Sequence, residues 1–202
     1  HRGFAGSSAF LPRRLASHGW VTVAPDHTDN TFADNVSPRA TSLYYTRSTD
    51  TTESLDQLET VGAGFLAGAP DTSRVLLSGH SFGCQSTYGS GGATFDGDVI
   101  AARCAAGEVE SGTCTQAEID VFRAGVTDDR IAALMPMACT PSQDWFGPSG
   151  HLSVTNPVLS MSGTADPVGT QGMFDRSGSL HYTWIDVEGA CHQAFGLGAC
   201  AE

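Results

Sequence analysis

A serine, an aspartate and a histidine in this chain of 202 residues have the types and the order needed to activate a hydroxyl group. Ser81 lies in the sequence Gly79-His-Ser-Phe-Gly83, which is the G-x-S-x-G pattern of a nucleophile elbow. In an elbow the serine occupies a strained turn between a strand and a helix, and the flanking glycines allow the two backbones to pack closely. We therefore expect the Ser81 hydroxyl to stand clear of a sheet, where a base can reach it.

A serine hydroxyl is a weak nucleophile until a base takes its proton, and an acid must orient that base. Asp166 follows the apolar run 158–162, and His192 follows the last apolar run, 180–187. The chain order Ser, Asp, His is one of those known for such triads. Both residues are expected in loops at the carboxyl ends of parallel strands, where ligands bind in open α/β sheets. The sequence therefore predicts Ser81 as the nucleophile, His192 as the base and Asp166 as the acid.

Other acidic residues and histidines lie at positions that suit a triad less well. Asp186 and His181 fall inside the last predicted strand, and Asp26 and His27 precede the nucleophile. His151 precedes the acid, and His80 occupies the variable position of the elbow.

A triad of this kind also needs backbone amides that stabilise the oxyanion of the tetrahedral intermediate. One donor is expected from the residue after the nucleophile, Phe82, and the other from the loop after the third strand of the sheet. The glycine-rich segment 1–8 lies one helix before the next predicted strand, where that loop belongs. Phe4 is therefore the second candidate donor.

The elements that must position these residues alternate between strand and helix. Apolar runs predict strands at residues 20–24, 75–77, 131–137, 158–162 and 180–187. A short helix is expected with Pro12 near its first turn and Gly19 beyond its end, and a longer one over residues 50–66 with Asp50 and Glu53 at its start. Residues 27–46 are predicted as a long surface loop and residues 89–125 as an irregular insertion. This alternation indicates a mostly parallel α/β sheet flanked by helices.

Composition indicates one globular domain spanning residues 1–202. No apolar run approaches the roughly 18 residues that a membrane span requires. The net charge of −12 disfavours nucleic acids and anionic membranes as partners. We expect a monomer that acts on a small or polymeric substrate.

Six cysteines are many for a cytosolic enzyme of this length, and their spacing lacks the paired C-x2-C of a zinc site. The short separations of Cys104 from Cys114 and of Cys191 from Cys200 predict two local disulfides, and hence a secreted or periplasmic protein. Cys84 and Cys139 are left as buried thiols or a third pair.

Five segments together resemble dienelactone-hydrolase-like serine esterases of the α/β-hydrolase superfamily. That group includes platelet-activating-factor acetylhydrolases and, more distantly, cutinase-like polyester hydrolases. The resemblance covers nearly the whole chain and rests on Gly3-Phe4, residues 15–27, Gly79-His-Ser-Phe-Gly83, Gly163-Thr-Ala-Asp-Pro167 and Gly189-Ala-Cys-His192. It implies an α/β-hydrolase fold, a Ser81–His192–Asp166 triad, oxyanion amides from Phe4 and Phe82, carboxylic ester substrates, and no cofactor or metal.

The chain departs from this family in three respects. Dienelactone hydrolases carry cysteine where this chain has Ser81, and the glycine usual after the elbow is Cys84 here. The family's opening strands and closing helix have no counterpart, which indicates a fragment or a chain shortened at both ends.

The resulting expectation is a serine ester hydrolase that works through an acyl-enzyme. The alternatives are an acyltransferase with the same triad and a non-catalytic binding module on the same fold. Trp145 and Phe146, in a predicted loop, are candidates for lining an acyl pocket, although aromatic residues in loops are more often simply packed.

Overall fold

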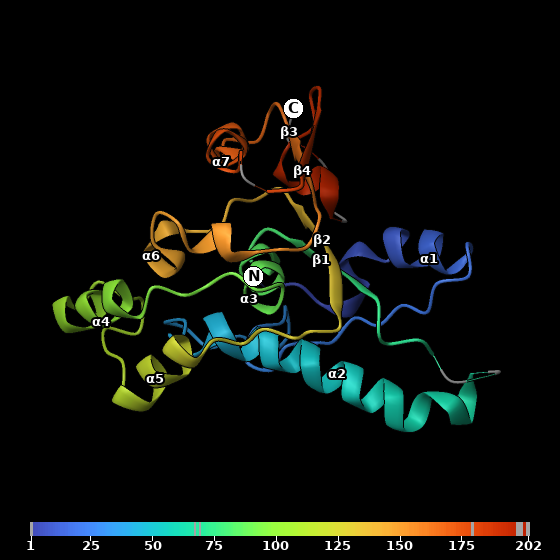
Figure 1. Ribbon diagram of the computed structural model, residues 1–202, viewed down its shortest axis with the longest axis horizontal. Helices are drawn as coiled ribbons and strands as arrows, with labels where there is room; N and C mark the ends of the chain where they lie inside the picture. The colour runs from blue at the N-terminus through green and yellow to red at the C-terminus, as the bar shows by residue number, and fades with distance from the viewer. Residues whose placement is uncertain (1, 67, 69, 179, 197–199, 201–202) are drawn as a thin grey trace.

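The computed structural model describes residues 2–66, 68, 70–178, 180–196 and 200 (Figure 1). Within these residues it shows an α/β architecture with one parallel sheet, as the alternation of strand and helix predicted. The strands lie in the order β1-β2-β3-β4 and are β1 (Val75–His80), β2 (Ile131–Met137), β3 (Val158–Gly163) and β4 (Tyr182–Val187). All four carboxyl ends therefore point to the same edge of the sheet.

Helices flank this sheet and connect its strands. The α-helices are α1 (Phe10–Ala16), α2 (Leu43–Phe65), α3 (Gly83–Ser90), α4 (Gly97–Ala106), α5 (Gln116–Ala124), α6 (Gln143–Phe146) and α7 (Thr170–Arg176). Three short 3-10 helices are η1 (Ala5–Ser8), η2 (Gly150–Ser153) and η3 (His192–Phe195). Helices α4, α5 and α6 lie together on one side of the molecule and α1 on the opposite side (Figure 1).

The main core forms where α3 packs against β1 and β2 and where α2 packs against α3. Its most deeply buried large side chains are Tyr88, Ile100, Phe122, Leu134 and Phe146. Every residue of α3 is buried, so the helix that follows the elbow is fixed in place by packing on several sides.

The strand predicted at residues 20–24 is absent. These residues have no regular secondary structure, and Trp20, Val21 and Val23 are 48%, 46% and 49% exposed. A strand needs a neighbour for its backbone hydrogen bonds, and the described residues provide none on this side of the sheet. The apolar run reflects a local preference for extended backbone, but the described part of the chain offers these residues no neighbouring strand with which to pair.

β1 is consequently an edge strand with β2 on one side only. The amide of Val75 donates to the carbonyl of Arg130 at 2.8 Å, and that of Ser81 donates to Met137 at 3.0 Å. Because donors alternate along a strand, the odd-numbered residues of β1 face β2. The backbone groups of Leu76, Ser78 and His80 therefore face the open edge.

Two other regions are more helical than predicted. α2 begins at Leu43, seven residues before the expected start at Asp50, because Tyr44 stacks on Trp145 and Tyr45 packs edge-on against Phe122. The expected surface loop 27–46 is shortened accordingly.

The segment 89–125, expected to be irregular, contains α4 and α5. Asp96 caps α4 by accepting a hydrogen bond from the amide of Val99, and Thr115 and Glu118 form a capping box at the start of α5. Of the predicted glycine-rich loop 1–8, residues 5–8 form η1, and His1 lies outside the described residues.

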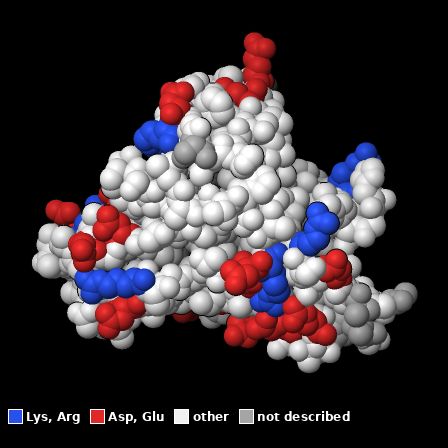
Figure 2. All heavy atoms as spheres, in the orientation of Figure 1, with Lys and Arg blue, Asp and Glu red and all other residues white. Residues whose placement is uncertain are grey.

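Acidic side chains occupy several parts of the face shown in Figure 2, with arginines beside some of them. Arg130, for example, binds the carboxylates of Asp56, Glu59 and Asp128. Among the helices that the structure describes, none combines the length and the apolar character needed to cross a membrane.

Candidate active site

Ser81 occupies the turn between β1 and α3 with a φ angle of +56°. A left-handed conformation costs a non-glycine residue on the order of 1–2 kcal/mol, so surrounding contacts must hold it. The sequence predicted this strained elbow, but its two glycines differ. A Cβ at Gly79 would collide with the backbone carbonyl of Gly83, whereas a Cβ at Gly83 would meet no atom within 4 Å. Close packing of strand and helix therefore requires glycine at position 79 only.

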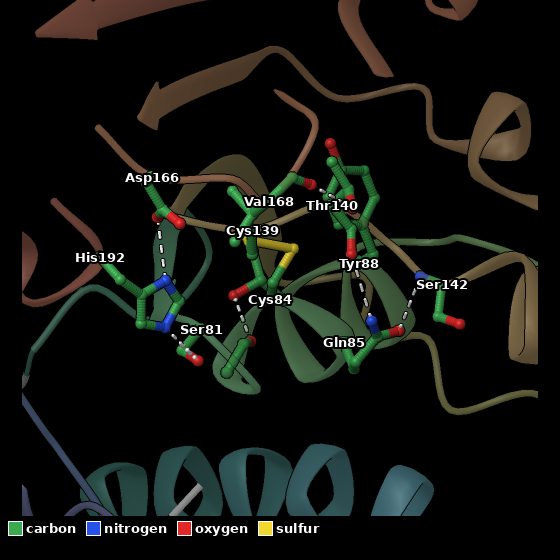
Figure 3. The surroundings of a disulfide bond; sticks show 12 residues. Ser81, Cys84, Gln85, Tyr88, Cys139, Thr140, Ser142, Asp166, Val168 and His192 are labelled. Atoms are coloured by element: carbon green, nitrogen blue, oxygen red, sulfur yellow. Dashed lines mark hydrogen bonds and ion pairs between the residues drawn. A yellow bond between two sulfur atoms is a disulfide. The ribbon is translucent and has the colours of Figure 1, made fainter. Parts of the chain in front are cut away.

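The structure brings together the three residues predicted as a triad (Figure 3). His192 Nε2 lies 2.8 Å from Ser81 Oγ, and His192 Nδ1 lies 2.9 Å from Asp166 Oδ2. Because a carboxylate only accepts, Nδ1 carries the proton donated to Asp166, and Nε2 is free to accept the Ser81 proton. This is the geometry that a general-base step requires.

Asp166 and His192 come from loops that follow β3 and β4 and that pack directly on each other. The Asp166 side chain is 1% exposed and that of His192 is 31% exposed. The amide of Ala165 donates to Ala190 at 3.1 Å, and a Cβ at Gly163 would collide with the same Ala190 carbonyl. The close contact of the two loops fixes the acid and the base relative to each other.

His80, which the sequence placed only at the variable position of the elbow, contributes a contact that the sequence did not predict. Its Nε2 donates to the backbone carbonyl of His192 at 2.8 Å, and the two imidazole rings lie 5.0 Å apart. Burial lowers the pKa of His80 below its ordinary value, which keeps the ring neutral at pH 7. His80 therefore tethers the loop that carries His192 to the strand that carries Ser81.

The two predicted oxyanion donors have different surroundings. Phe82 is the N-cap residue of α3, where the partial positive charge of a helix N-terminus favours a developing negative charge. The amide of Phe4 donates to Ser7 Oγ at 2.7 Å. A role for Phe4 as an oxyanion donor remains a prediction, and it requires the contact with Ser7 to open.

Ser81 opens into a cleft of about 780 Å³ that extends along the open edge of β1. Its walls include Phe4, the exposed segment 20–24 and Leu55. The prediction that Trp145 and Phe146 line an acyl pocket is wrong. Both are buried in the core, because Trp145 stacks on Tyr44 and Phe146 stacks on Phe95.

One wall of the cleft carries a second histidine–carboxylate pair beside a buried guanidinium. His27 Nδ1 lies 2.6 Å from Asp50 Oδ2, yet burial and the charge of Arg47 lower the pKa of His27. Burial also lowers the pKa of Arg47 to about 10, and its guanidinium donates to Asn30 Oδ1 at 2.7 Å. His27 and Arg47 thereby place polar atoms on the wall of the cleft.

All six cysteines are paired in the structure. The predicted disulfides Cys104–Cys114 and Cys191–Cys200 are confirmed, and the pairing left open from the sequence is a third disulfide, Cys84–Cys139. Three disulfides fit a protein that folds in an oxidising environment.

No cluster of three or more His, Cys, Asp or Glu side chains with the arrangement of a metal site occurs among the described residues. No protein-family model and no curated protein matches this chain.

Proposed function

We propose that this protein is a serine hydrolase of the α/β-hydrolase fold that cleaves carboxylic esters through an acyl-enzyme. The observation that carries the proposal is the continuous hydrogen-bonded series from Asp166 through His192 to Ser81. A strained serine at the carboxyl end of a parallel strand, joined in this way to a histidine and a buried carboxylate, matches the parts of a nucleophilic triad.

In the proposed reaction, Ser81 Oγ attacks the ester carbonyl carbon while His192 Nε2 takes the hydroxyl proton. The tetrahedral intermediate places its negative charge near the N-terminus of α3, where the Phe82 amide is the candidate donor. Its collapse expels the alcohol, which receives the proton from His192. Water, activated by the same imidazole, then releases the carboxylic acid and restores Ser81.

Asp166 contributes by holding His192 in the tautomer that leaves Nε2 available and by stabilising the imidazolium that forms. Its near-complete burial strengthens this interaction, since the local dielectric is low. The three disulfides further support a site of action outside the cytosol, in the periplasm or the extracellular medium.

Hydrolysis of p-nitrophenyl acetate and p-nitrophenyl butyrate tests the proposal. We expect Ser81→Ala to lower kcat/KM by at least ~10³-fold with an unchanged circular dichroism spectrum, because triad members act as a unit. A fluorophosphonate probe should label the unaltered protein at Ser81.

The matched control is Ser149→Ala, since Ser149 is exposed, is not among the residues that line the cleft and makes no side-chain capping hydrogen bond. This variant should keep its turnover and its labelling. Turnover retained by Ser81→Ala, or labelling of another residue, would contradict the proposed nucleophile.

A further inference from the structure

The disulfide between Cys84 and Cys139 lies beside the elbow (Figure 3). Cys84 belongs to the first turn of α3, and its amide donates to the carbonyl of Ser81 at 3.0 Å. Cys139 follows β2 in a loop that reaches toward β3. Both cysteines are buried, at 0% and 7% exposure. The bond therefore joins the nucleophile's helix to the loop that follows β2.

Two strained residues flank this bond. Ser81 has a φ of +56° and Ala138, next to Cys139, has a φ of +51°. The amides on either side of this junction are also engaged, since Ser81 donates to Met137 at 3.0 Å and Ala138 donates to Met161 at 2.8 Å. Strained backbone persists only where its surroundings constrain it strongly, and the disulfide supplies a covalent constraint beside both residues.

The loop after Cys139 continues to the segment that carries the acid. Thr140 Oγ1 donates to the carbonyl of Val168 at 3.2 Å, two residues beyond Asp166. On its other side the loop meets α3, because Gln85 Nε2 donates to the carbonyl of Thr140 at 3.3 Å. Residues 139–142 thus connect the nucleophile's helix to the acid's loop.

The polar contacts across this connection are long and the disulfide is covalent. Hydrogen bonds of 3.2 Å or more lie at the weak end of the usual range, and the amide of Ser142 reaches Gln85 Oε1 at 3.4 Å. Such bonds allow small displacements that a buried disulfide does not. The disulfide therefore adds a covalent link from α3 to residues 139–142, beside the backbone hydrogen bonds of Ser81 and Ala138. The Thr140–Val168 hydrogen bond continues that link to the acid's loop.

We propose that the Cys84–Cys139 disulfide is a positioning element of the active site, which holds Ser81 in register with the loop of Asp166 and thereby with His192. It touches neither substrate nor reacting atoms, and this inference rests on the proposed ester hydrolysis. A displacement of about 1 Å between reacting groups can lower a rate by about 10²-fold. Loss of the bond therefore lowers kcat while leaving KM nearly unchanged.

The test compares two double variants that each remove one disulfide and leave no free thiol. Cys84→Ala/Cys139→Ala is expected to lower kcat for p-nitrophenyl butyrate by roughly 10- to 100-fold, with KM within about twofold. Cys104→Ala/Cys114→Ala is the control, since that disulfide joins α4 to the segment before α5. The control should melt at a lower temperature but keep kcat within about twofold.

A second measurement covers the case in which the Cys84→Ala/Cys139→Ala protein does not fold. Thr140→Val removes the hydroxyl bonded to Val168 while the disulfide stays intact, and it should lower kcat by roughly two- to tenfold at constant KM. Thr140→Ser restores the hydroxyl and should restore kcat.

Unchanged kcat in folded Cys84→Ala/Cys139→Ala, or equal losses of kcat in both double variants, would overturn the positioning role. If the double variant does not fold, unchanged kcat in Thr140→Val would overturn it. Absence of ester hydrolysis in the unaltered protein would instead overturn the proposed function.

Discussion

Replacement of Gly79 by alanine tests whether the close approach of β1 and α3 sets the position of Ser81, the proposed nucleophile. A Cβ at this position would lie against the carbonyl oxygen of Gly83, and 2.5 Å from both the Gly83 carbonyl carbon and Thr87 Oγ1. Ordinary contacts of carbon atoms lie near 3.5–4.0 Å. The strand and the helix must therefore separate by about 1 Å to accept one methyl group.

Both stability and rate should respond to that separation. Overpacking of a well-packed core costs about 1–3 kcal/mol of the free energy of unfolding, and each kcal/mol lowers Tm by about 2–4 °C for a protein of this size. Gly79→Ala should therefore lower Tm by roughly 2–12 °C. Since Ser81 lies in the turn between the two elements, a shift of about 1 Å should lower kcat by about 10²-fold.

Gly83→Ala is the matched control within the same motif. The added Cβ meets no atom within 4 Å, and alanine stabilises a helix relative to glycine by up to about 1 kcal/mol. This variant should melt at the same or a higher temperature and keep kcat within about twofold. Thermal melting and p-nitrophenyl butyrate hydrolysis measure both quantities. Equal behaviour of the two variants in either assay would refute the reasoning.

Three further outcomes are expected. Cys200→Ser should lower kcat more than it raises KM, because the disulfide with Cys191 restrains the residue next to His192. It should also lower the free energy of unfolding by about 2–3 kcal/mol, by the loop-closure relation. An unchanged kcat would argue against this restraint. His80→Ala should lower kcat up to about tenfold, since it removes the hydrogen bond to the His192 carbonyl. His80→Gln retains a donor and should lower kcat less. Equal losses of kcat in the two variants would argue against the tether. The free energy of unfolding should be highest above about pH 6.5 and should decrease as the pH falls below it. Burial lowers the pKa of His27, His80 and His151 in the folded state, so the unfolded chain takes up protons at a higher pH than the folded one. Melting temperatures that stay constant from pH 7 to pH 5 would contradict this.

The candidate site was largely predictable because its signals are local. Gly79 to Gly83 fixes a turn whose geometry follows from the residue types, and Asp166 and His192 each follow an apolar run closely. In a parallel sheet, position after a strand is enough to bring residues to one edge. The contact between His80 and the His192 carbonyl depends on how two loops cross, and the sequence contains no local signal for it.

The fold was less predictable where a long-range partner decides the outcome. Residues 20–24 have the composition of a strand, but a strand exists only with a neighbour. The early start of α2 depends on the packing of Tyr44 against Trp145, which lies 101 positions further along the chain. For α5, by contrast, the Thr115–Glu118 capping box is a local signal for a helix start, and the expectation of an irregular segment at 89–125 overlooked it.

The edge position of β1 gives this strand, which ends at Ser81, an uneven resistance to amide hydrogen exchange. The amides of Val75, Leu77 and Gly79 face β2 and should exchange slowly, whereas those of Leu76, Ser78 and His80 face the cleft and have no partner among the described residues. Exchange measured residue by residue should therefore alternate with a period of two along β1 and end at Ser81. The proposed nucleophile would thus be attached to an edge strand in which every second amide opens to the cleft.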